Sequence, residues 1–222
     1  MRMIVILTAQ HTGTWFVIDF IEEALNERVI LFKDLLFQNK PETNILHCHI
    51  APTIEGIHPN DKLKHITPIL LNSFVSAYKT IITVRDPILS IITRQNRHPD
   101  FDHTYIVNAF EWMAELYFRK LSHVFFLPVD LFNTFDARLS LLKSLCKFIG
   151  ADANSGFIKE YATSWILKNS TLDISGLKAK YLSGDFDAIK QKFPKEINTL
   201  SKNFLIQKFM EDLGYRKLIW FK

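Results

Sequence analysis

The stretch IVILTAQHTGTWF, residues 4–16, decides the fold of this chain. It opens on a short apolar run typical of a buried strand, and the apolar spacing after Gly13 is that of a helix. Gly13 permits the sharp backbone turn that joins the two elements. Backbone N–H groups at the start of a helix and the positive end of its dipole attract anions, so this turn is a candidate phosphate-binding loop. A plain strand-to-helix turn with a capping threonine would give the same pattern.

Four further apolar runs, rich in β-branched or aromatic residues, follow this stretch at residues 29–32, 45–49, 80–84 and 124–127. Enough chain separates successive runs for a crossover connection. Strands that alternate with helices in this way predict a three-layer α/β/α fold with a parallel five-stranded sheet. The apolar spacing and the capping residues predict helices over residues 61–77, 87–95, 102–121, 136–149, 155–168, 185–193 and 194–213.

The composition is that of a compact globular protein. Of its 222 residues, 48% are hydrophobic and 23% are charged, and a chain of this length buries a core without disulfide or metal staples. We expect one domain over residues 1–222, with an α/β core over 1–152 and a helical C-terminal lobe over 153–222. The net charge of +4 favours a small anionic ligand and is too low for the basic stripe typical of nucleic acid binding.

Two cysteines, Cys48 and Cys146, lie far apart in apolar surroundings. They indicate no disulfide framework and favour a reducing compartment. The first apolar run is too short for a secretory signal or a membrane span. We therefore expect a cytoplasmic protein without a membrane span.

A second polar feature lies in KTIITVRDPILSIITR, residues 79–94. Arg85 follows a predicted strand and so stands at the carboxyl edge of the sheet, where open α/β folds bind ligands. A guanidinium group binds phosphate through two parallel hydrogen bonds, and Thr93, two helical turns on, offers a hydroxyl to the same anion. An ion pair of Arg85 with Asp86 or Asp102 is the alternative interpretation.

The third feature is ILHCHIAP, residues 45–52, in which the strand period of two places His47 and His49 on one face. Three interpretations are open: a zinc site, two hydrogen-bonded core histidines, or an acid or base role for one imidazole. A zinc site would need further ligands, and no spacing such as His-Glu-x-x-His supplies them.

Together these segments resemble the sulfotransferases that use 3′-phosphoadenosine 5′-phosphosulfate (PAPS). The first loop of that family reads P-K-[ST]-G-T-T-W, and QHTGTWF aligns Thr12, Gly13 and Thr14 with its central residues. The lysine of the family falls on His11. The tryptophan of the loop, which would stack on the adenine, corresponds to Trp15 or Phe16.

Two further motifs extend the resemblance. The strand of the family that carries the catalytic base reads K-T-H-L-P, which aligns His49 with the base and His47 with the lysine. The 3′-phosphate motif has an arginine and, eight residues later, a serine, which correspond to Arg85 and Thr93. AKYLSGDF is similar to R-K-G-x-x-G-D-W and places Lys180 near the nucleotide.

The resemblance implies a P-loop NTPase-like fold and transfer of a sulfuryl group from PAPS, without a metal ion. The acceptor would be a hydroxyl or amine of a small molecule, a sugar or a lipid, with His49 as the general base and with His11 and His47 at the leaving group. A small-molecule kinase is the first alternative, in which Asp86 or Asp130 would hold Mg²⁺. However, the lysine of a Walker A loop does not follow Gly13. The second alternative is an inactive nucleotide-binding module, which the two lysine-to-histidine departures favour.

Overall fold

The computed structural model describes residues 3–8, 14–31, 44–50, 68–97, 103–131, 134–152, 154–169 and 176–215. The chain divides into two compact units. The first, here called the sheet unit, comprises Met1–Ile50, Ile69–Val84 and Ser122–Leu172. The second, here called the helical unit, comprises Ala51–Pro68, Arg85–Leu121 and Asp173–Lys222. The assignment of residues 1–222 to a single domain stays a prediction.

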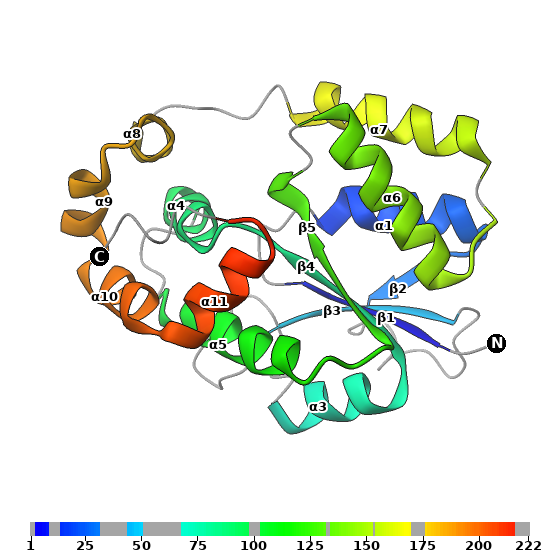
Figure 1. Cartoon of the computed structure of the whole chain (residues 1–222), viewed down its shortest axis with the longest axis horizontal. Helices are drawn as coiled ribbons and strands as arrows, with labels where there is room; N and C mark the ends of the chain where they lie inside the picture. The colour runs from blue at the N-terminus through cyan, green and yellow to red at the C-terminus, as the bar shows by residue number, and fades with distance from the viewer. Residues whose placement is uncertain are drawn as a thin grey trace. The chain divides into compact units, whose positions relative to one another are not determined.

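A parallel five-stranded sheet forms the centre of the sheet unit (Figure 1), as the sequence predicts. The order of its strands is β2-β3-β1-β4-β5. All residues of the central strand β1 are buried, which fits a strand that is covered on both faces and reads as an uninterrupted apolar run. The strands are β1 (Ile4–Thr8), β2 (Val29–Leu31), β3 (Ile45–His49), β4 (Lys79–Val84) and β5 (Val124–Pro128).

Helices cover both faces of this sheet. Figure 1 shows α1 (Thr14–Leu25), α6 (Phe135–Ile149) and α7 (Ser155–Asn169) together on one side, and α3 (Pro68–Ala77) on the other. Alternate residues of β1, together with apolar residues of α1, α6 and α7, form one continuous core cluster. The predicted three-layer arrangement is therefore present within this unit. Of the helix predicted over 61–77, residues 61–67 lie outside the described residues.

The ends of α6 show why this helix begins and ends where it does. Thr134 caps the start, because its hydroxyl accepts a hydrogen bond from the Ala137 N–H. Gly150 ends the helix in the left-handed conformation, with φ of +79°, as its position in the sequence predicts. The buried Arg138 donates from Nε to the Ala162 carbonyl at 2.5 Å and so ties α6 to α7.

The helical unit contains α4 (Pro87–Arg97), α5 (Thr104–Phe118), α8 (Gly176–Ser183), α9 (Phe186–Lys192), α10 (Pro194–Lys202) and α11 (Phe204–Asp212). The prediction of one helix over 194–213 is wrong, because Asn203 interrupts it and separates α10 from α11. The Asn203 Oδ1 accepts from the Ile206 N–H at 3.1 Å and caps α11, while its Nδ2 donates to Glu111 Oε1 on α5 at 3.0 Å. An asparagine that caps a new helix and bonds to a neighbouring one favours a break over a continuous helix.

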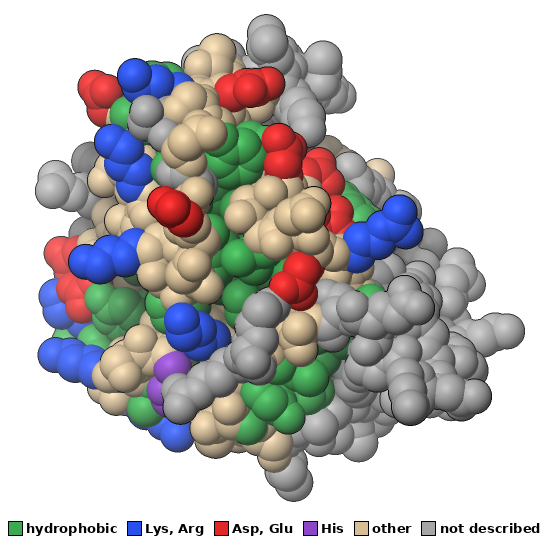
Figure 2. All heavy atoms as spheres, turned by 90° about the vertical axis from the view of Figure 1, so that its right-hand side faces the viewer, with side chains coloured by type: hydrophobic (Ala, Val, Ile, Leu, Met, Phe, Trp, Pro, Cys, Tyr) green, Lys and Arg blue, Asp and Glu red, His purple; other side chains and the backbone are tan. Residues whose placement is uncertain are grey.

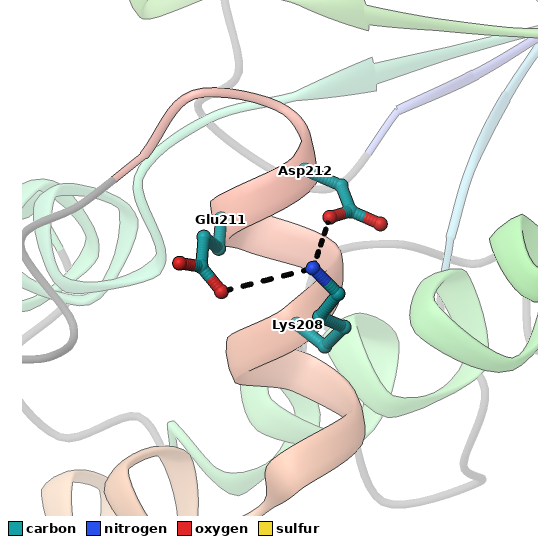
Figure 3. Close-up of polar contacts among 3 residues, drawn as sticks. All are labelled: Lys208, Glu211 and Asp212. Atoms are coloured by element: carbon teal, nitrogen blue, oxygen red, sulfur yellow. Dashed lines mark ion pairs between the residues drawn. The ribbon is translucent and has the colours of Figure 1, made fainter.

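The described surface carries charges of both signs. On α11, the Lys208 Nζ lies 2.7 Å from Asp212 Oδ1 and 3.9 Å from Glu211 Oε2 (Figure 3), and the hydrogen bond to Asp212 raises the pKa of Lys208. On the face that Figure 2 shows, basic and acidic side chains of the described residues are interspersed and form no continuous basic stripe. No helix within the described ranges combines the length and apolar character that a membrane span needs.

Candidate functional site

Polar residues lie at or next to the ends of three neighbouring strands, at the carboxyl edge of the sheet. Thr8, the last residue of β1, is in register with His49 of β3 on one side and with Thr83 of β4 on the other. Thr8 and Thr83 are both fully buried. In open parallel sheets ligands bind beyond this edge, and here the candidate phosphate-binding loop leaves β1 directly after Thr8.

His47 is tied to the end of β1. Its Nε2 lies 2.9 Å from Thr8 Oγ1, and its side chain is only 3% exposed. Of the interpretations that the sequence left open, a hydrogen-bonded core histidine fits this geometry, and a role of His47 at the leaving group stays a prediction. The backbone of His49 ends β3, and its side chain lies outside the described residues.

The candidate loop itself, with His11, Thr12 and Gly13, lies outside the described residues. The helix after it, α1, begins at Thr14, whose side chain is also outside them. The first turn of α1 contains no acidic residue. The positive end of this helix dipole is therefore not neutralised by a carboxylate of its own first turn, which favours an anion there.

The two loop aromatics differ in burial. Trp15 is 67% exposed, whereas Phe16 is 7% exposed and belongs to the core cluster. The Phe16 ring lies 5.7 Å, centroid to centroid, from the ring of Tyr161 on α7. Phe16 is thus occupied with core packing, and Trp15 is the exposed aromatic of the pair; a role of either in binding adenine stays a prediction.

Arg85 and Thr93 lie together in the helical unit. The Arg85 Nη1 donates to Thr93 Oγ1 across 3.4 Å, and the Thr93 hydroxyl donates to the Leu89 carbonyl at 2.7 Å. The single hydroxyl hydrogen of Thr93 is therefore committed to the helix backbone, and its oxygen accepts from the guanidinium group. This arrangement orients Arg85, which is half-buried at the start of α4. The structure thus brings the two residues together, and their role as phosphate ligands stays a prediction.

Asp86, which follows Arg85 in the sequence, caps one helix and binds a tyrosine of another. Its Oδ1 accepts from the N–H groups of Ile88 and Leu89 and caps α4, and its Oδ2 accepts from the Tyr181 hydroxyl at 2.6 Å. Both oxygens of this buried carboxylate therefore have hydrogen-bond donors already. This use of Asp86 weakens the alternative in which it holds Mg²⁺ for a kinase.

Lys180 is exposed on α8, next to the buried Tyr181. No apolar spacing in the sequence indicates this helix. Gly184, with φ of +93°, ends α8, and Asp185 caps α9 by accepting from the Ala188 N–H at 3.3 Å. Gly184 and Asp185, which match the R-K-G-x-x-G-D-W pattern, are thus accounted for by the end of one helix and the start of the next.

The two cysteines are unsuited to metal binding or nucleophilic chemistry. Burial raises the pKa of the Cys48 thiol, and it raises the pKa of Cys146 to about 11. Both are free and buried, so both are neutral thiols near pH 7. Within the described ranges, no group of three or more His, Cys, Asp or Glu side chains is placed to hold a metal ion.

Two residues with side-chain partners are not indicated by any motif: Thr8 in the sheet unit and Tyr181 in the helical unit. Thr8 carries a weak signal, because it is a polar residue at the end of an otherwise apolar strand. Tyr181 carries none, because its partner Asp86 is 95 positions away.

Comparison with known proteins identifies a solved structure with a similar fold. No protein-family model and no curated protein matches this chain. Among solved structures, the chain matches the mouse sulfotransferase SULT7A1 complexed with PAP, at a TM-score of 0.61 and 12% sequence identity. The match covers 96% of this chain and 88% of the mouse chain. This chain therefore has the P-loop-like α/β fold of a sulfotransferase.

Proposed function

We propose that this protein transfers a sulfuryl group from PAPS to a hydroxyl or amine of an acceptor and releases PAP, adenosine 3′,5′-bisphosphate. The fold supports this proposal but does not carry it, since one fold serves many functions. The observation that carries it is the contact between Arg85 and Thr93, at the exit of β4 and with the spacing of the 3′-phosphate motif.

In this proposal Arg85 binds the 3′-phosphate of the nucleotide. Its fork of N–H donors matches two phosphate oxygens, and Thr93 holds the guanidinium group in place. ATP and ADP have no 3′-phosphate, so this contact selects PAPS over them. Lys180 adds a second positive charge, and Trp15 stacks on the adenine.

The 5′-phosphosulfate is held by the loop that precedes α1. Backbone N–H groups at Gly13 and Thr14 and the side chains of Thr12 and His11 stabilise the negative charge that develops on the departing phosphate oxygen. The bond between His47 and Thr8 fixes the strand end from which this loop starts. His47 thus supports the leaving-group site through Thr8.

The chemical step is an in-line displacement at sulfur. His49 accepts the proton of the acceptor hydroxyl or amine, and the freed lone pair forms a bond to sulfur. The bond between sulfur and the bridging oxygen breaks, and its electron pair leaves with PAP. The acceptor is a small molecule, a sugar or a lipid.

The two free, buried cysteines fit a reducing compartment such as the cytoplasm.

The proposal is tested by titration calorimetry of the wild-type protein with PAP, ADP and ATP. We expect PAP to bind at least about tenfold more tightly than either, since one charge-assisted contact contributes on the order of 1.5 to 3 kcal/mol. Equal affinity for PAP and ATP would overturn the proposal and favour the kinase.

A further inference from the structure

We propose that Tyr181 is a positioning residue that fixes the helix bearing Lys180 to the segment bearing Arg85, so that both cations meet the 3′-phosphate. This inference rests on the proposed function, and it adds to it a residue that the motif comparison does not identify. The residues involved all belong to the helical unit.

The connection runs through one carboxylate. The Tyr181 hydroxyl donates to Asp86 Oδ2 at 2.6 Å, and Tyr181 is fully buried. The other oxygen of the same carboxylate caps the first turn of α4. Tyr181 follows Lys180 in the sequence, and Asp86 follows Arg85. This side-chain bond therefore links the backbone at Lys180 to the backbone at Arg85.

The helix that carries Lys180 needs such an anchor. With eight residues, α8 is too short to be stable by its own backbone hydrogen bonds. The edge-on contact of the Tyr181 ring with Phe186, at 5.8 Å between ring centroids, joins α8 to the next helix. The hydroxyl bond to Asp86 joins α8 to α4. Removing that hydroxyl leaves the ring packing in place and removes the hydrogen bond to Asp86.

Tyr181 stands where the R-K-G-x-x-G-D-W pattern has its first glycine. A glycine has no side chain with which to bond to Asp86, so this chain has an attachment that the pattern itself does not provide. Gly184 and Asp185, which do match the pattern, end α8 and begin α9. The departure at Tyr181 therefore has a physical role beside the two matching residues.

The variant Tyr181→Phe tests the inference, with binding of PAP and of AMP measured by calorimetry. AMP lacks the 3′-phosphate. Apparent affinity scales with the fraction of molecules that are in the binding-competent arrangement. If α8 keeps its place in only about a tenth of the molecules once the bond is lost, PAP affinity therefore falls roughly tenfold. AMP affinity should stay unchanged. In turnover, the KM for PAPS should rise and kcat should hold.

The matched control is Tyr161→Phe. The Tyr161 hydroxyl also donates to a carboxylate at 2.6 Å, that of Glu23, but within the sheet unit. This variant should leave the ratio of PAP to AMP affinity at the wild-type value. The double variant Asp86→Asn/Tyr181→Phe removes the buried charge together with its donor, and it provides the same comparison if the single variant does not fold.

Hydrogen exchange of residues 176–183 supplies a readout that needs no nucleotide. Faster exchange there in Tyr181→Phe, with exchange in β1 and β4 unchanged, together with the selective loss of PAP affinity supports the inference. Wild-type PAP selectivity in a folded Tyr181→Phe protein overturns the inference alone. A wild-type protein that does not distinguish PAP from AMP overturns the proposed function, and the inference with it.

Discussion

Replacing Arg85 by alanine should remove the main contact of this protein with the 3′-phosphate of its nucleotide. Arg85 is half-buried, and its Nη1 lies 3.4 Å from Thr93 Oγ1, so the guanidinium group is already oriented before a ligand arrives. A preoriented group loses little side-chain entropy on binding, and most of the interaction energy then appears as affinity.

The size of the effect follows from the type of contact. A charge-assisted hydrogen bond contributes about 1.5 to 3 kcal/mol, and each 1.4 kcal/mol is tenfold in affinity. PAP should therefore bind to Arg85→Ala roughly 10-fold to 150-fold more weakly. Thr93→Val should weaken PAP binding only about twofold to tenfold. The Thr93 hydroxyl donates its hydrogen to the Leu89 carbonyl, so Thr93 affects the ligand only by orienting Arg85.

A double-mutant cycle measured by calorimetry separates these roles. If Thr93 acts by orienting Arg85, the effects of Arg85→Ala and Thr93→Val on PAP affinity are not additive, and the double variant resembles Arg85→Ala alone. Arg119→Ala removes an exposed arginine elsewhere in the helical unit and serves as the control. Additive effects, or an equal loss of AMP affinity in Arg85→Ala, would refute the reasoning.

Three further predictions concern the histidines and the cysteines. His49→Ala should lower turnover about a hundredfold to ten-thousandfold and leave PAP affinity nearly unchanged in calorimetry, because a general base acts on the acceptor; a parallel loss of PAP affinity would contradict this role. An ordinary imidazole loses its charge near about pH 6.5, whereas a lysine loses it only near about pH 10.4. The turnover rate of His11→Lys at pH 8 should therefore be higher than that of the wild type. Identical pH-rate profiles would contradict a cationic His11. Burial raises the pKa of Cys146 to about 11 and also that of Cys48, so a thiol reagent at pH 8 should label neither in the folded protein and both in denaturant; rapid labelling of the folded protein would contradict their burial.

The strands could be predicted from the sequence because each contains a short apolar run rich in β-branched or aromatic residues. The spacing of Arg85 and Thr93, two helical turns apart, also indicated that both could serve one anion site, and the structure adds their direct contact. Local geometry was sufficient in both cases.

The remaining features depend on partners that are distant in the sequence. The bond from Thr8 to His47 requires the parallel register of β1 and β3, which no local pattern encodes. The bond from Tyr181 to Asp86 requires α8 and α4 to pack together. The break at Asn203 depends on local capping and also on Glu111 of α5, so apolar periodicity alone predicted one long helix.

The central claim is that this protein transfers a sulfuryl group from PAPS. The most direct test incubates the wild type and His49→Ala with ³⁵S-labelled PAPS and a broad panel of sugars, lipids and small alcohols and amines, and measures labelled product. The account predicts labelled product from at least one acceptor class with the wild type, and a loss of about a hundredfold or more with His49→Ala. No labelled product from any acceptor, together with transfer of ³²P from γ-labelled ATP to the same panel, would contradict it.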